Sequence, residues 1–130
     1  MREIKFRAFV ENNGIEKIME VVEMGFDNKC ILVCNDSGET FLNNKYKLMQ
    51  YTGLKDKNGK EIYEGDIVSL FYETQISEVR FNSKYGCWEV KVQLSIYSQG
   101  WDLLGNHLGE SEVIGNIYEN PELLSEMNTE

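Results

Sequence analysis

Oxygen-bearing side chains crowd the segment from residue 56 to residue 66, and carboxylates at such density are typical ligands of Ca²⁺. The side chains are Asp56, Asn58, Glu61, Glu64 and Asp66. A calcium-binding loop that begins at Asp56 requires a ligand at its fifth position, glycine at its sixth and glutamate at its twelfth. The residues found there are Lys60, Glu61 and Ile67. The spacing therefore favours a charged hairpin, and we expect no metal and no cofactor.

The thiols and the imidazole also lack a catalytic or zinc-binding arrangement. The chain has three cysteines and one histidine, without the paired spacing of a zinc site. Cys30 and Cys34 lie in one apolar run that is typical of a strand, and four strand residues span about 13 Å, too far for a disulfide or a shared metal. We expect buried thiols in a reducing cytoplasm.

Nucleophilic catalysis would need a pair such as Cys87 with His107, but nothing in the sequence marks that pair. His107 lies between Gly105 and Gly109, which predicts a loop side chain. A phosphate-binding glycine loop is absent. We therefore expect no catalytic residues and no enzyme activity.

Aromatic side chains are frequent after residue 50. Small barrels use such side chains, when they are exposed, to bind peptides or single-stranded nucleic acid, and core packing is the competing explanation. They are Tyr51, Tyr63, Phe71, Tyr72, Tyr85, Trp88, Tyr97 and Trp101.

The charge balance narrows the classes of partner. With 13 basic and 22 acidic residues the net charge is −9, which opposes general nucleic-acid binding because phosphate contacts need cations. The simplest explanation of the negative charge is that it keeps the protein soluble. A more specific explanation is an acidic surface that captures a basic protein. No apolar run approaches the ~20 residues that cross a membrane, and charged residues interrupt the first ten positions, so we expect a cytoplasmic protein.

Short alternating segments punctuated by turns predict a mainly β protein. Strands are expected near residues 4–9, 29–33, 39–42, 48–52, 67–71, 75–81, 87–94 and 112–118. Residues 15–24 are ambiguous, because Ile15, Ile18 and Met19 have helical spacing although turns bound the segment. Residues 95–110 have no clear course: Trp101, Leu103 and Leu104 should pack, and residues 105–109 should loop.

The segment 56–59 predicts a tight hairpin. Asp56 fits the first position of a type I turn, and Gly59 fits a left-handed position that closes a bulge. This three-residue loop places Asp56 opposite Lys60, whereas a two-residue loop would place Asp56 opposite Glu61, a like-charge pair. We favour the three-residue loop. We also expect Gly53 and Gly65 to be turn glycines.

The C-terminal segment predicts a short helix, in which Asn120 is the cap and Pro121 occupies the first turn. Leu123, Leu124 and Met127 give it one apolar side. That side needs a surface, which is either the chain's own core or a neighbouring copy in a homo-oligomer.

Residues 1–8, 49–68 and 113–124 together resemble the YopX family of phage and prophage proteins. The resemblance implies an N-terminal β subdomain over residues 1–52, an SH3-like barrel over residues 53–120, and a short helix and tail over residues 121–130. It also implies strands in residues 15–24 and a role in the cytoplasm of a bacterial host. The family supplies no catalytic residues to transfer.

These observations favour a non-enzymatic protein that acts through contacts with a host or phage protein. The alternative is a nucleic-acid-binding module built on an SH3-like barrel, which the aromatic residues favour and the charge opposes.

Overall fold

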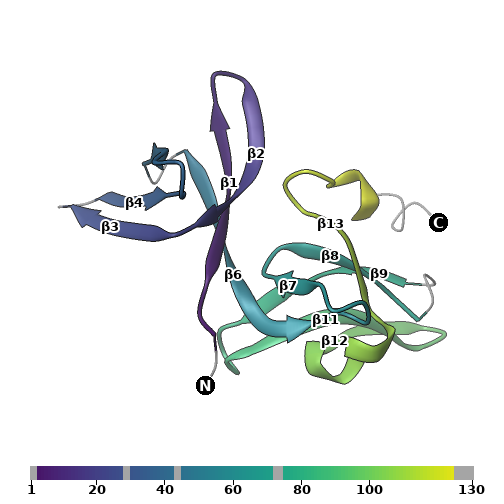
Figure 1. The fold of residues 1–130 in the computed structure, drawn as a ribbon. Helices are drawn as coiled ribbons and strands as arrows, with labels where there is room; N and C mark the ends of the chain where they lie inside the picture. Colours follow the sequence, from purple (N-terminus) through teal and green to yellow (C-terminus); the bar gives the residue numbers. More distant parts are fainter. Residues whose placement is uncertain (1–2, 28–29, 43–44, 72–74, 125–130) are drawn as a thin grey trace. The chain divides into compact units, whose positions relative to one another are not determined.

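The structure, a computed structural model, describes residues 3–27, 30–42, 45–71 and 75–124. Most of them lie in β-strands (Figure 1), so the predicted mainly β class is confirmed. The chain divides into two compact units, Met1–Tyr51 and Thr52–Glu130. No helix in the described part of the chain is long and apolar enough to cross a membrane.

The first unit contains two small antiparallel sheets. Its strands are β1 (Phe6–Asn12), β2 (Ile15–Val21), β3 (Glu23–Asp27), β4 (Cys30–Cys34), β5 (Thr40–Phe41) and the first half of β6 (Tyr46–Lys55). Strand β1 pairs with both β2 and β6, and β4 pairs with both β3 and β5. The core of the unit consists of Ala8, Val10, Met19, Val33 and Phe41.

Residues 15–24 form strands, as the family resemblance implied, despite their helical spacing. Met19 is buried because it lies opposite Ala8 in the β1–β2 ladder. Ile15, which the helical pattern would place on the same apolar stripe, is exposed at the end of the hairpin. The alternation of a half-buried strand, not a helical period, therefore describes this segment.

The second unit contains the C-terminal strands and one 3₁₀ helix. They are β7 (Glu61–Tyr63), β8 (Asp66–Leu70), β9 (Gln75–Glu78), β10 (Arg80–Asn82), β11 (Cys87–Ser95), β12 (Ser98–Leu103), η1 (Leu104–Glu110) and β13 (Glu112–Asn116). The sheet orders are β13-β8-β9 and β10-β11-β12. Val68, Leu70, Val90, Val92 and Leu104 belong to its core.

The chain passes from one of these sheets to the other at Val79. The Val79 amide donates to Asp66 O at 2.8 Å, and the Val79 carbonyl accepts from Gly65 N at 2.9 Å. A side-chain hydrogen bond then connects strands β9 and β11, since Lys91 N on β11 donates to Ser77 Oγ on β9 at 2.8 Å. Such corners curl sheets toward each other. The SH3-like barrel itself stays a prediction.

The hairpin between β6 and β7 has the predicted three-residue loop. Asp56 N donates to Lys60 O at 2.8 Å, and Gly59 N donates to Asp56 O at 3.0 Å. Gly59 has the left-handed φ of 81° that closes the bulge. Asp56 thus lies opposite Lys60, and the register that avoids the like-charge pair is the one observed.

The two expected turn glycines, Gly53 and Gly65, differ from each other. Gly65 has φ 85° in the turn between β7 and β8, as predicted. Gly53 has φ 84° but lies inside β6, so its prediction as a turn glycine was wrong. The Thr52 hydroxyl accepts a hydrogen bond from Leu54 N at 3.1 Å across this glycine. A positive φ inside a strand is typical of a bulge.

Residues 105–109 do not form the predicted loop but belong to the 3₁₀ helix η1. Leu104 is fully buried, as predicted, whereas Leu103 is 48% exposed, against the prediction. Leu103 is the last residue of β12, and Leu104 begins the helix that turns into the core. A 3₁₀ helix lacks a strong sequence signature because its runs are short.

A short helical turn near the C-terminus follows Pro121 and begins at Glu122, and the described residues end at Leu124. Leu123 N donates to Asn120 O at 3.1 Å, as expected for a cap residue. The Asn120 side chain, however, accepts from Asn116 N at 3.2 Å, so it closes the preceding turn. Met127 lies outside the described residues.

Candidate functional site

The acidic hairpin uses its carboxylates to hold the backbone. Asp56 is 6% exposed, and its Oδ1 accepts from Asn58 N and Lys60 N, each at 2.9 Å. Its Oδ2 accepts from Val113 N at 2.9 Å. Asp66 is buried as well and accepts from Tyr63 N at 2.7 Å. In the part of the chain that the structure describes, no group of three His, Cys, Asp or Glu could hold a metal.

The cysteine prediction was wrong for Cys34, which is only half-buried. Val33 occupies the inward position of β4, so its neighbour faces the other side of the sheet. The Cys34 thiol lies 3.2 Å from the Thr40 hydroxyl. The Cys30 side chain lies outside the described side chains. Cys87 is half-buried, and its thiol is 4.0 Å from Glu89 Oε2.

His107 is not a loop side chain, as the sequence had suggested, but the buried centre of a charged cluster whose two carboxylates are partly exposed. It lies on η1 and is 9% exposed. Its Nε2 is 2.8 Å from Asp102 Oδ2, and its Nδ1 is 2.6 Å from Glu110 Oε1. The Phe71 ring meets the imidazole edge-on at 5.5 Å between centroids.

The pKa of His107 follows from this environment. Burial alone would lower it, but the hydrogen bonds with Glu110 and Asp102 outweigh burial and raise the His107 pKa above its ordinary 6.5. The hydrogen bond from His107 in turn lowers the pKa of Asp102. Because both ring nitrogens face carboxylates, neither is directed at a substrate, and the cluster is built to hold charge. A histidine with an acid three residues later was the only sequence signal for it.

The aromatic residues divide between core and surface. Tyr51 and Tyr63 are buried, and Trp88 packs against the core of the second unit. Tyr85 and Tyr97 are 71% and 90% exposed. Tyr72 lies outside the described residues. The Trp101 ring stacks on Arg80, whose guanidinium carbon is 3.4 Å from the ring centroid. Neither explanation from the sequence, core packing or an exposed surface, therefore applies to all of these residues.

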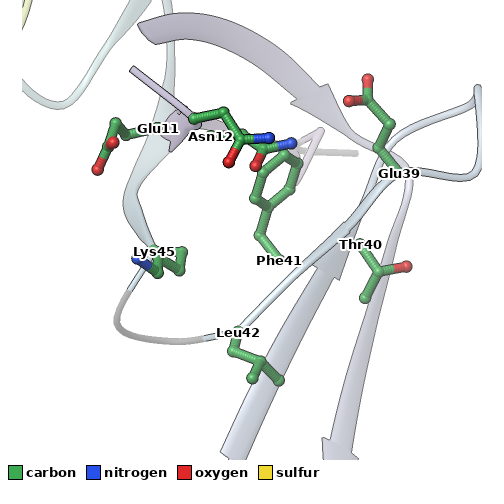
Figure 2. A pocket seen from close by; sticks show the side chains of 8 residues that line it. Glu11, Asn12, Glu39, Thr40, Phe41, Leu42 and Lys45 are labelled. Atoms are coloured by element: carbon green, nitrogen blue, oxygen red, sulfur yellow. The ribbon is translucent and has the colours of Figure 1, made fainter. Parts of the chain in front are cut away.

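A hollow of about 560 Å³ opens in the first unit (Figure 2). Glu39 on its rim is already neutralised, because Lys17 Nζ donates to it at 2.7 Å and Asn35 Nδ2 at 2.9 Å. Both hydrogen bonds lower the pKa of Glu39, and the bond from Lys17 has the larger effect. The hollow is lined by Glu11, Asn12, Asn13, Glu39, Thr40, Phe41, Leu42 and Lys45. We assign no ligand to it.

A smaller cleft of about 200 Å³ in the second unit is acidic and aromatic. Burial raises the pKa of the Tyr118 phenol, and the negative charges of Glu64 and Glu78 raise it further. The residues that line the cleft are Glu64, Gly65, Glu78, Val79, Arg80, Phe81, Ile117 and Tyr118.

The turn between β11 and β12 presents apolar side chains to solvent. Leu94, Ile96 and Tyr97 are 64%, 83% and 90% exposed. The turn is ordered by Ser95, whose hydroxyl accepts from Tyr97 N at 3.1 Å and lies 3.0 Å from the Ser98 hydroxyl. We call Leu94–Tyr97 the apolar tip.

Comparisons with known proteins agree with this strand-rich fold. The crystal structure of protein EF1440 from Enterococcus faecalis is similar to this chain, with 31% sequence identity and a TM-score of 0.57. The match covers 95% of this chain and 99% of that one. No curated protein matches the chain. A family model described as YopX protein matches residues 5–125, and the chain therefore belongs to the YopX family.

Proposed function

We propose that this protein acts by binding another protein, without catalysis, and that the apolar tip is its contact surface. The observation that carries the proposal is the exposure of Leu94, Ile96 and Tyr97 together at the end of one hairpin. Exposed apolar side chains that gather in one place are typical of interaction sites, and aromatic residues are enriched at the centre of interfaces.

The apolar tip is also organised before any partner arrives. The hydrogen bonds of Ser95 hold the turn that carries Ile96 and Tyr97. Gly100 on the neighbouring strand leaves room for the Leu94 side chain, which a Cβ at that position would meet. A turn that is already ordered loses less conformational entropy on binding.

Because the chain is acidic, we expect its partner to be a basic protein. The net charge of −9 attracts a basic protein and speeds its encounter with the tip. Membership of the YopX family supports a phage or prophage protein that meets a host or phage partner in the bacterial cytoplasm.

Nucleic-acid binding is the second candidate, and one observation favours it. On the β10–β11 turn, Lys84 Nζ lies 5.3 Å from the ring centroid of Tyr85, which is 71% exposed. A cation beside an exposed ring is the kind of platform that single-stranded nucleic acid uses. Generic duplex DNA should nevertheless bind weakly at physiological salt, because the chain has nine more acids than bases.

Photo-crosslinking separates the two candidates. A benzophenone amino acid replaces Tyr97 in one variant and Tyr85 in another, and each variant is irradiated in bacterial lysate with and without nuclease. We expect a protein adduct from position 97 that survives nuclease, and binding of the purified partner weakened about tenfold by Ile96→Ser, as for an interface residue worth about 1.4 kcal/mol. Tyr85→Ser is the matched control and should leave that affinity unchanged.

Two outcomes would reject the proposal. If the purified partner binds Ile96→Ser as tightly as the parent protein, the apolar tip is not the contact. If only position 85 gives an adduct, and nuclease removes it, the nucleic-acid candidate replaces protein binding.

A further inference from the structure

We propose that Asp102, His107 and Glu110 form a pH-sensitive latch, which fastens η1 while the imidazole is protonated and loosens it when the proton leaves. The proposal is independent of the proposed function. It begins from the two distances in the cluster, 2.8 Å to Asp102 and 2.6 Å to Glu110.

The geometry requires a doubly protonated ring. A neutral imidazole has one N–H donor and one bare nitrogen, whereas an ionised carboxylate only accepts. With both nitrogens at hydrogen-bond distance from carboxylates, only imidazolium supplies both contacts. Loss of the proton leaves one carboxylate facing a lone pair, and the cluster then carries two negative charges with a single hydrogen bond between ring and acids.

The latch joins two consecutive elements of the chain. Asp102 belongs to β12, whereas His107 and Glu110 belong to η1. Helix η1 begins without a side-chain cap, and 3₁₀ helices have weak internal hydrogen bonds. Leu104 anchors its first residue in the core. At its other end, Ser111 O accepts from Lys57 N at 3.0 Å. In the middle of η1, Leu108 packs against the core and Leu108 O accepts from Ser111 Oγ at 3.2 Å, and the latch adds a charged fastening to these contacts.

The ionisable groups that contact His107 among the described residues are Asp102 from β12 and Glu110 from η1. From the end of β8, Phe71 contributes an uncharged ring edge. Asn106 Nδ2 lies 3.4 Å from Asp102 Oδ1, which helps to keep that carboxylate in place. The raised pKa of His107 places the switch above the ordinary 6.5, within reach of pH changes around neutrality.

The test uses the full chain, in which His107 is the single histidine and so gives unambiguous imidazole NMR signals. The His107 pKa is measured in the wild type, Asp102→Asn, Glu110→Gln and the control Glu112→Gln. Glu112 lies near Lys57, 3.7 Å away. We expect a wild-type pKa above 6.5, a lower value in the first two variants, and no change in the control.

Amide hydrogen exchange of the wild type, corrected for the intrinsic effect of pH, supplies the second measurement. Protection of residues 105–110 should fall as pH rises through the measured pKa, while protection of β1 stays constant. The protection factor of η1 should fall by about tenfold for each unit by which the His107 pKa in the folded protein exceeds that in the unfolded chain. An imidazole pKa at or below 6.5, or protection of η1 that does not follow the imidazole titration, would overturn the latch. Both measurements on the wild type hold even if a variant fails to fold.

Discussion

Two buried side chains of the second unit, Asp56 and His107, are held in opposite ways. The Asp56 carboxylate accepts hydrogen bonds from the backbone amides of Asn58, Lys60 and Val113. The His107 imidazole is held by two carboxylates. Backbone amides do not titrate near neutral pH, whereas imidazolium does. The hairpin at Asp56 is therefore a fixed part of the fold, and η1 depends on a proton.

The largest effect should come from the fixed cluster. Asp56→Ala removes the charged acceptor of the backbone amides of Asn58, Lys60 and Val113, and a hydrogen bond to a charged group contributes about 1.5–3 kcal/mol. We expect the free energy of unfolding to fall by about 3 kcal/mol or more, measured by urea denaturation. Asp36→Ala, in an exposed turn of the first unit, is the control and should change it by about 0.5 kcal/mol or less. Equal losses in both variants would contradict the account of Asp56.

A smaller loss of folding stability should follow when a substitution strains the turn between β7 and β8. Gly65→Val places a β-branched side chain at φ 85°, a conformation that such residues rarely adopt. We expect a loss of more than about 1 kcal/mol, the typical value for a point mutation. Gly109→Val is the matched control, because Gly109 lacks a positive φ and has open space around it. A melting temperature that is unchanged by Gly65→Val would contradict this prediction.

The difference between the clusters also explains which of them could be predicted from the sequence. Two of the three bonds of the Asp56 carboxylate lie within four residues of Asp56, so turn chemistry and charge were enough to choose the loop. The His107 cluster depends on the 3₁₀ turn that brings Glu110 beneath the ring, on the end of β12, and on Phe71, which is distant in sequence. Apart from the three-residue spacing of His107 and Glu110, none of these contacts has a local pattern.

Elsewhere in the fold, local patterns predicted the strands better than the exposure of single residues. Alternation and turn residues predicted most strands, and the helical spacing of residues 15–24 misled because Ile15 lies at an exposed hairpin end. The apolar tip was not predicted, since Leu94, Ile96 and Tyr97 have the composition of a core strand. Only their placement at a hairpin turn exposes them.

The central claim is that the stability of η1 depends on the His107 proton, and one pair of stability curves tests it most directly. The free energy of unfolding of the wild type and of His107→Gln is measured from about pH 5.5 to 9, across the range in which histidine titrates. Because the folded pKa of His107 lies above 6.5, its contribution is fully present below the unfolded value and is lost as pH rises through the folded one. We predict a difference between the curves that is largest at low pH and shrinks above neutrality. A difference that stays constant across this range would contradict the account.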